Sequence, residues 1–198
     1  MFTGIIETKG IVTAIEKKEA NIRFFISSPL SASFKTDQSI SHNGVCLTIE
    51  GVNGETHEVT AINETLQKTT LGSWKVGDVI NIERCLQMNG RIDGHIVQGH
   101  VDTVAKCIDA KDRNGSWEFT FEIDKNFSCL IIEKGSISIN GISLTIFNIT
   151  DTTFTVAIIP YTFSHTNMNI LYVNDIVNIE FDMIGKYVNR MMLPGKRD

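Results

Sequence analysis

The residues best suited to chemistry lie in a stretch that the sequence repeats. Residues 39–49 read SISHNGVCLTI and residues 136–146 read SISINGISLTI, with eight of eleven positions identical. Side chains alternate between the two faces of a strand, so one face of each copy carries small hydroxyls, and the first copy adds the thiol of Cys46. Such a face can hydrogen-bond a flat polar ligand. Many solvated strand faces carry serine and threonine and bind nothing, but a merely solvated face would not demand the same residues in two copies.

Two histidines and a lysine are further candidates. His100 lies in GHIVQGHVD at residues 94–102, and His95 precedes it by five positions. Imidazole exchanges protons near neutral pH, although most lone histidines are surface or core residues. Five positions along a strand place side chains on opposite faces, which argues against joint metal ligation. A buried cysteine such as Cys46 is more often inert packing than a nucleophile, and Lys134 is typical of a solvated loop charge.

The two repeated stretches are predicted to be β-hairpins. Asn43-Gly44 and Asn140-Gly141 each separate alternating apolar and small polar residues, and Asn-Gly suits a two-residue turn with positive φ at both positions. Such a turn pairs Ser41 with Cys46 on the hydroxyl face. It places Ile40 opposite Leu47 on the core face. The spacing of 97 residues between the copies is too long for a solenoid unit and indicates two homologous domains.

Strand-like segments also match between the halves outside the hairpins. Residues 1–14 predict one or two strands separated by Gly10, and G-I-I-E-T at 4–8 matches G-H-V-D-T at 99–103. This alignment puts His100 just inside the first strand of the second half, where the first half has Ile5. Further strands are expected at 21–30, 77–83, 117–124 and 174–180. Short strands between Gly, Asn and Asp predict an antiparallel barrel or sandwich in each half, joined by residues 86–96.

The last part of the chain has a helical period. From Asp182 to Leu193, apolar residues recur at the spacing of an amphipathic helix, which Pro194-Gly195 would end. A helix after two closed domains can fold back on a barrel or pair with copies of itself. Its position after both domains favours pairing with copies of itself. We therefore predict one barrel at 1–96, a second at 97–181, and an oligomerisation helix and tail at 182–198.

Composition argues against several classes of partner. The 198 residues carry a net charge of −5 without a basic stripe, which argues against binding nucleic acid. The sequence shows neither an apolar run of about 18 residues, as a membrane span needs, nor a secretory signal. Four irregularly spaced cysteines suggest neither zinc ligation nor a disulfide framework, so a cytoplasmic location is expected. Phosphate-binding glycine loops, dinucleotide fingerprints and metal-ligand spacings are missing as well.

Five motifs, in order along the chain, resemble the riboflavin synthases of the two-barrel, alpha-chain type. They are MFTGIIE, SHNGVCLTI, GHIVQGHVD, INGISLTI and NIEFDMIGKYVNRM, and the match covers essentially the whole chain. The resemblance implies an all-β protein with two homologous six-stranded Greek-key β-barrels in tandem and a C-terminal α-helix that assembles a homotrimer. It also implies a transferase reaction. Two molecules of 6,7-dimethyl-8-ribityllumazine dismutate by transfer of a four-carbon unit, giving riboflavin and 5-amino-6-(D-ribitylamino)uracil without a metal or redox cofactor.

The same resemblance implies two sets of ligand contacts, with each site formed between the N-terminal barrel of one subunit and the C-terminal barrel of its neighbour. Contacts in the first barrel would come from Gly4, Ile5, Ile6, Ser39, Cys46, Leu47, Thr48, Ile62 and Thr65. Contacts in the second barrel would come from Gly99, His100, Val101, Lys134, Ser143, Leu144, Thr145, Ile159 and Thr162.

Catalysis is expected where the two copies differ, because donor and acceptor molecules must be treated differently. The differing pairs are Cys46 and Ser143, His100 and Ile5, and Lys134 and Asp37. Proton transfer from a lumazine 7-methyl group is assigned to His100, with the catalytic candidates Ser39, Cys46 and Thr145 nearby. Asp182 matches an acidic position of the family near the site. The identity of the base stays open, and deprotonation assisted by the substrate is an alternative.

A non-catalytic lumazine- or flavin-binding fluorescent accessory protein is the alternative from another class. Such a protein would share the two barrels without catalysis or trimerisation. His100, Cys46, the second Ser-Leu-Thr and a long terminal helix are the discriminating features, and all are present in this sequence. They favour the enzyme. A purely structural double barrel would leave the repeated hydroxyl faces unexplained.

Overall fold

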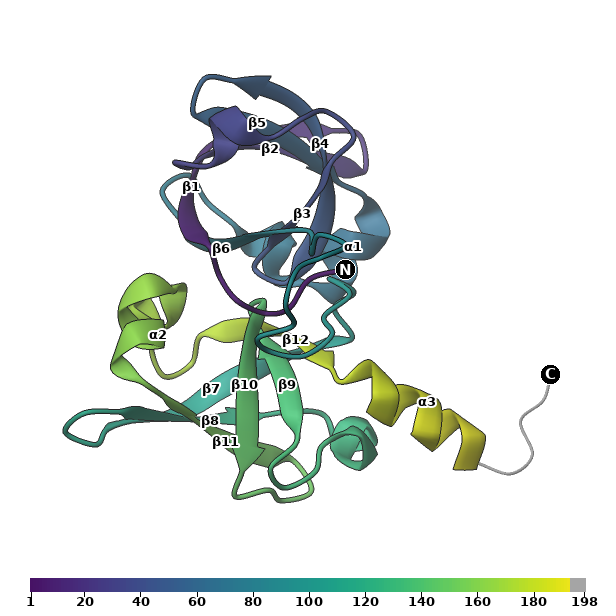
Figure 1. The fold of residues 1–198 in the computed structure, drawn as a ribbon, viewed down its shortest axis with the longest axis vertical. Coiled ribbons are helices and arrows are strands. Elements are labelled where there is room, and N and C mark those ends of the chain that lie inside the picture. Colours follow the sequence, from purple (N-terminus) through teal and green to yellow (C-terminus); the bar gives the residue numbers. More distant parts are fainter. Residues whose placement is uncertain (193–198) are drawn as a thin grey trace.

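Two closed antiparallel barrels follow one another along the chain in the computed structural model, which describes residues 1–192 (Figure 1). The first contains β1 (Thr8–Lys18), β2 (Asn21–Ser27), β3 (Ser39–His42), β4 (Val45–Asn53), β5 (Thr56–Ala61) and β6 (Val79–Arg84). The second contains β7 (Thr103–Asp112), β8 (Trp117–Glu122), β9 (Ser136–Ile139), β10 (Ile142–Phe147), β11 (Thr153–Ile158) and β12 (Ile176–Phe181). Neighbours follow the order β1-β2-β5-β4-β3-β6, and the second barrel repeats it as β7-β8-β11-β10-β9-β12. The predicted pair of six-stranded barrels is confirmed.

The two Asn-Gly turns form as predicted. Asn43 and Gly44 have φ of 48° and 79°, and Asn140 and Gly141 have φ of 46° and 83°. The register pairs Ser41 with Cys46 in the first hairpin, and the second hairpin has the same register. Inward-facing aliphatic and aromatic side chains fill each barrel, and Ile40 and Leu47 belong to the first core.

The hairpin tips meet each other, which changes the environment of two hydroxyls. A Cβ built on Gly44 would lie 2.7 Å from the amide nitrogen of Gly141, so the two turns touch backbone to backbone. Ser41 and Ser138, which the sequence placed on an open polar face, are each only 1% exposed. The face open to a ligand is therefore narrower than predicted, because the two turns meet and the serine before each turn is buried.

The segments that open the two halves are not strands of their own barrels. β1 begins at Thr8 and runs through Gly10, so residues 1–7 lie outside the strands of the first barrel. Phe2 pairs instead with Val97, through bonds of 2.7 and 3.1 Å between their backbone groups. His100 likewise precedes β7 rather than lying inside it, which corrects the predicted position. The reason is a turn with positive φ at Gly4 (77°) and at Gly99 (81°), which directs the chain away from the strand.

Short helices complete the described chain. α1 (Asn63–Lys68) and α2 (Pro160–His165) occupy matched positions, and each is only six residues long, too short for a helical period to stand out. Four 3₁₀ turns lie at Ser31–Ser33 (η1), Thr70–Ser73 (η2), Lys125–Leu130 (η3) and Asn167–Ile170 (η4).

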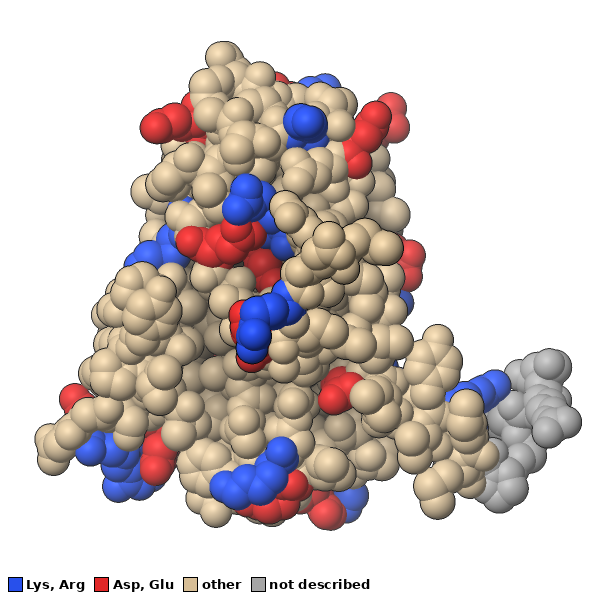
Figure 2. Space-filling view, viewed as in Figure 1, with Lys and Arg blue, Asp and Glu red and all other residues tan. Residues whose placement is uncertain are grey.

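The predicted terminal helix is present as α3 (Met183–Met192), which projects from the second barrel (Figure 1). Its predicted end at Leu193 and Pro194-Gly195 falls outside the described residues. Lys186 Nζ binds the carboxylate of Asp102 at 2.9 Å and ties the helix to the start of β7. Acidic and basic side chains are interspersed over the visible face of both barrels, and α3 is mostly uncharged (Figure 2). Within residues 1–192, no helix has the length and apolar character to cross a membrane.

Candidate active site

The opening segment of each half lies against the hairpin of the other half. The amide of Cys46 donates to the carbonyl oxygen of Gly99 at 2.9 Å, and the amide of Ser143 donates to that of Gly4 at 2.8 Å. A Cβ built on either glycine would lie 2.6 Å from the Cβ of its partner, so only glycine permits these approaches. The structure thus corrects the predicted grouping, in which each opening segment served its own barrel.

The packing of two side chains also shows that each opening segment lies against the barrel of the other half. Ile6 is partly buried against the core of the second barrel, and Val101 is partly buried against the core of the first. A first site therefore combines the β4 hairpin with residues 99–101, and a second site combines the β10 hairpin with residues 4–6. We use the names first site and second site in this sense below.

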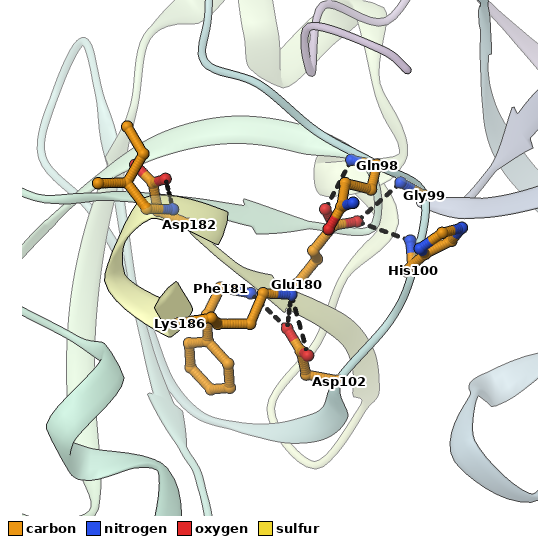
Figure 3. Close-up of polar contacts among 9 residues, drawn as sticks. Gln98, Gly99, His100, Asp102, Glu180, Phe181, Asp182 and Lys186 are labelled. Carbon is orange, nitrogen blue, oxygen red and sulfur yellow. Dashed lines mark hydrogen bonds and ion pairs between the residues drawn. The ribbon is translucent and has the colours of Figure 1, made fainter. Parts of the chain in front are cut away.

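Two buried glutamates hold the opening segments in place. The carboxylate of Glu180, at the end of β12, accepts hydrogen bonds from the amides of Gln98 (2.6 Å), Gly99 (2.9 Å) and His100 (2.9 Å) (Figure 3). Glu83 on β6 accepts equivalent bonds from Thr3 (2.7 Å) and Gly4 (3.1 Å). Burial raises the pKa of both carboxyls, and these hydrogen bonds partly oppose that rise.

The first site is a cleft of about 250 Å³ beside the thiol of Cys46. It is lined by Cys46 and Thr65 from the first barrel and by Gly99, His100 and Val101 from the exchanged segment. Glu64, Lys68 and Thr69 also line it, through the start and end of α1, and were not predicted. Their contribution depends on a helix turn that the sequence pattern does not reveal.

Four other predicted contacts of the first site are not among the residues that line this cleft. Thr48 is exposed on the outer face of β4, and Ile62, 54% exposed, precedes α1. Leu47 is 6% exposed and belongs to the core, so it can reach a ligand only through its backbone. Ser39 shares its β-bridge with Thr48, and its carbonyl oxygen accepts a bond from Cys85 Sγ at 3.1 Å. Ser39 and Thr48 therefore pair as the register predicts, and Thr48 shares a face of β4 with Cys46.

The thiol of Cys46 is protonated at neutral pH. Burial raises its pKa, and the hydrogen bond with the Ser39 hydroxyl lowers it by less. A protonated thiol is a weak hydrogen-bond donor and a poor nucleophile. Cys46 is thus suited to binding or proton exchange with a ligand rather than to covalent attack.

The second site has the same plan with different side chains. Ile5 (46% exposed) stands where the first site has His100, and Ser143 stands where it has Cys46. Thr145 is exposed on β10, Ile159 (60% exposed) precedes α2, and Thr162 lies in α2. Leu144 is buried in the second core, as Leu47 is in the first. With residues 4–6 and 99–101 exchanged between the two predicted sets, the residues therefore form two related but chemically distinct surfaces.

Lys134 and Asp182 lie at the edges of the second barrel. Lys134 has φ of 66°, close to the 68° of Asp37, which confirms that these residues are structural equivalents. Its Nζ lies 5.6 Å from the ring centre of Phe147, on the outer face of β10 that Thr145 shares. Asp182 accepts a bond from the amide of Ile184 at 3.0 Å at the start of α3 (Figure 3). Within one chain, Thr145 and His100 belong to different sites.

His95 lies beside the second site as well, although the sequence analysis used its spacing only to argue against joint metal ligation with His100. Its Nδ1 lies 2.7 Å from Ser143 Oγ, and its ring is almost wholly buried. That argument assumed a strand, and residues 94–96 do not form one. The amide of His95 binds the carbonyl of Thr3 instead, and this brings the ring onto β10.

Comparisons with known proteins match both halves of the chain to one family. The family model described as the lumazine binding domain matches residues 3–85 and again residues 98–182. The riboflavin synthase of Bacillus amyloliquefaciens is 36% identical over 97% of this chain and 90% of its own length. The riboflavin synthase of Schizosaccharomyces pombe is 38% identical over 97% of this chain and 94% of its own length.

Solved structures extend the similarity of fold. LumP complexed with riboflavin superposes with a TM-score of 0.86 at 24% identity, over 91% of this chain and 99% of LumP. LumP complexed with 6,7-dimethyl-8-(1'-D-ribityl) lumazine gives a TM-score of 0.83 over the same fractions. At that identity the likeness shows the fold alone. Because two lumazine-binding domains cover most of the chain and its relatives match along their length, the chain belongs to the two-domain riboflavin synthase family.

Proposed function

We propose that this chain is a riboflavin synthase. It converts two molecules of 6,7-dimethyl-8-ribityllumazine into riboflavin and 5-amino-6-(D-ribitylamino)uracil. One molecule donates a four-carbon unit and the other accepts it. The atoms of the two products add up to those of the two substrates, so the reaction consumes no oxidant or reductant. The named activity of the full-length relatives supports the proposal.

The observation that carries the proposal is the pair of related sites in one chain. The bonds from Cys46 to Gly99 and from Ser143 to Gly4 build them in the same way, from matched segments. Two copies of one substrate need two similar binding surfaces. A donor and an acceptor need different reactive groups, and the sites differ where His100 and Cys46 are replaced by Ile5 and Ser143. Holding the two ring systems in a fixed orientation can supply roughly 7–11 kcal/mol of the barrier.

The proton steps are assigned to the groups of the first site and their neighbours. His100 is exposed at the mouth of the cleft, beside Cys46, and can exchange a proton with a bound lumazine. Ser39, through its bond with the Cys46 thiol, orients that thiol. Thr145 and Asp182 are the proposed contributions of the other barrel.

A homotrimer with sites between subunits is part of the proposal. His100 and Thr145 lie in different sites of one chain, so a partner subunit is required if both act on one ligand pair. The exposed apolar side chains of α3 favour such an assembly, because Ile184 is 64% exposed and Met191 is 80% exposed. We also place the enzyme in the cytoplasm, which accords with four free thiols at Cys46, Cys85, Cys107 and Cys129.

One mixing experiment tests the function. Purified protein is incubated with the lumazine in the presence of a chelator and without nicotinamide, and riboflavin is followed by absorbance and chromatography. Equal amounts of riboflavin and the pyrimidine product support the synthase. Tight binding of the lumazine without product would instead identify an accessory binding protein.

A further inference from the structure

The second site contains a serine and a histidine in hydrogen-bond contact. Ser143 Oγ lies 2.7 Å from His95 Nδ1, and His95 is only 8% exposed. Gly94 covers the pair, because a Cβ built on it would lie 2.8 Å from Ser143 Oγ and 2.1 Å from the carbonyl oxygen of Thr3. The position of His95 on β10 therefore depends on a glycine before it and on Thr3 from the other end of the chain.

The ring has an unusual environment for a packing residue. Among residues 1–192, no group bonds to the buried Nε2 of His95. Burying an imidazole nitrogen without a partner is costly, and an apolar ring would pack in the same space without that cost. The carboxylate of Asp182 acts on the ring from the start of α3. Glu83 acts less directly, by holding Thr3, whose carbonyl accepts the His95 amide.

His95 lies just before the segments that align between the two halves. These opening segments align with an offset of 95 residues, which matches Met1 with Ile96. Each site has one imidazole beside the residue that differs between the copies. The first site has His100 in its cleft with Cys46, and the second has His95 bonded to Ser143.

We infer that His95 is a positioning residue that activates Ser143 as the proton acceptor of the second site. This inference rests on the proposed function. Neutral His95 accepts the Ser143 hydroxyl hydrogen at Nδ1, which turns a lone pair of Oγ toward the ligand. As the ligand methyl C–H bond breaks, its proton bonds to Oγ and the former hydroxyl proton bonds to Nδ1. The products of the step are a ligand carbanion, an intact serine and an imidazolium that Asp182 stabilises.

The ionisation of His95 fits this direction of transfer. Burial lowers the pKa of His95, and the nearby Asp182 carboxylate opposes that shift. The ring is therefore neutral at pH 7 and ready to accept a proton. The nearby negative charge then favours the charged form that the step produces.

The test is a double-mutant cycle with His95→Asn, Ser143→Ala and the double variant, measured on the full chain. We expect each single substitution to lower kcat on the order of 10²-fold. The double variant should be no slower than the worse single one, because the two groups act as a unit. Riboflavin affinity, measured by fluorescence quenching, should change by less than about threefold, since the loss is in turnover rather than binding. The acid limb of the wild-type kcat profile should disappear in His95→Asn.

His165→Asn is the matched control. His165 Nδ1 also lies against a serine hydroxyl, that of Ser164 at 2.9 Å, but on the exposed surface of α2. This variant should keep the wild-type kcat and pH profile. A control that loses as much activity as His95→Asn would overturn the specific role of the buried pair.

The other outcomes are separable. If wild-type protein forms riboflavin and His95→Asn keeps its kcat, or if the two single losses multiply in the double variant, the inference is wrong and the proposed function stands. If the wild type forms no riboflavin, both are wrong. Should His95→Asn fail to fold or to bind riboflavin, Ser143→Ala decides alone. Wild-type turnover in that variant would overturn the inference, and a large loss of kcat at unchanged affinity would support it.

Discussion

Cys46 and Gly99, 53 positions apart in the sequence, share a backbone hydrogen bond of 2.9 Å. This bond brings the thiol of the first barrel beside the segment that opens the second half, where His100 follows directly. Ser143 and Gly4 share the equivalent bond at 2.8 Å. The two barrels thus complete each other's sites.

Replacing His100 should affect turnover more than binding. We expect His100→Ala to lower kcat by about 10²–10⁴-fold, the range for loss of a general acid or base. The affinity for the lumazine, measured by fluorescence titration, should change little because the cleft keeps its other walls. Ile5→Ala provides the contrast, since it should weaken ligand binding more than it slows turnover. Equal losses of kcat and affinity in His100→Ala would contradict a catalytic role.

The carboxylate of Glu180 should contribute strongly to stability. Glu180→Gln keeps the shape but removes the charge that accepts three amide hydrogen bonds. We expect the free energy of unfolding in urea to fall by roughly 1.5–3 kcal/mol, the value for hydrogen bonds to charged groups. Glu122→Gln, on the exposed part of β8, should stay within about 0.5 kcal/mol of wild type. Equal effects of the two substitutions would show that Glu180 does not hold residues 98–100.

Contact between the hairpin tips should make Gly44 sensitive to a single methyl group. Gly44 and Gly54 have positive φ of 79° and 60°, so alanine at either position costs about 1–2 kcal/mol in backbone strain. Only at Gly44 would the new Cβ also meet another backbone, at 2.7 Å, whereas nothing lies within 4 Å of the Gly54 position. Gly44→Ala should therefore lose roughly 1–3 kcal/mol more than Gly54→Ala in chemical unfolding. Similar losses would mean that the turns do not press on each other.

Two buried histidines should make the first barrel sensitive to acid. His42 Nε2 lies 2.9 Å from His57 Nε2, and His57 Nδ1 lies 2.7 Å from Ser31 Oγ. Burial lowers the pKa of His57 to about 4, and burial and the neighbouring His57 lower the pKa of His42 well below its usual value. As the pH falls, these two histidines therefore take up protons more readily in the unfolded chain than in the folded chain. Stability is complete above pH of about 6.5 and falls as the pH drops toward 4.

The measurement for this pair is urea unfolding between pH 7 and pH 5. A lowered histidine pKa predicts that the free energy of unfolding decreases across this window, by roughly 1–2 kcal/mol for each histidine. The raised pKa of Glu83 and of Glu180 acts in the opposite direction, so the comparison must isolate the histidines. The double variant His42→Gln, His57→Gln should show a flatter dependence. If the free energy of unfolding of that variant depends on pH as steeply as that of the wild type, the histidine pair is not the cause of the dependence.

The outer face of α3 should matter for assembly and not for folding of the barrels. Met191 is 80% exposed, so Met191→Glu should change the free energy of unfolding of the barrels by less than about 0.5 kcal/mol. We expect it to reduce the apparent mass in analytical ultracentrifugation and to reduce turnover with it. Val52→Glu, on an exposed edge of β4, should leave both unchanged. A monomeric wild type with full activity would contradict the proposed trimer.

Local chemistry in the sequence was sufficient to predict the hairpins, and it left a barrel or a sandwich open for each half. The resemblance to the riboflavin synthases implied the two six-stranded barrels. The Asn-Gly turns determine the register because both positions need positive φ, and alternation then determines which side chains face the core. The helical period from Ile184 to Met192 predicted α3, because apolar residues at that spacing form one stripe along a helix. These features depend on residues that are neighbours along the chain. The boundary between the domains at residues 96 and 97 stays a prediction.

Contacts between distant backbone segments were decided only by the tertiary structure. No sequence pattern encodes that residues 4–6 cross to the second barrel and residues 99–101 to the first, because the bonds join segments far apart in the chain. The burial of Ser41 and Ser138 at the meeting of the two turns follows from the same packing. The contact of His95 with Ser143 requires Gly94 and Thr3 together. Alternation along a strand could predict which residues share a face, but only the arrangement of the two barrels determines which faces form a site.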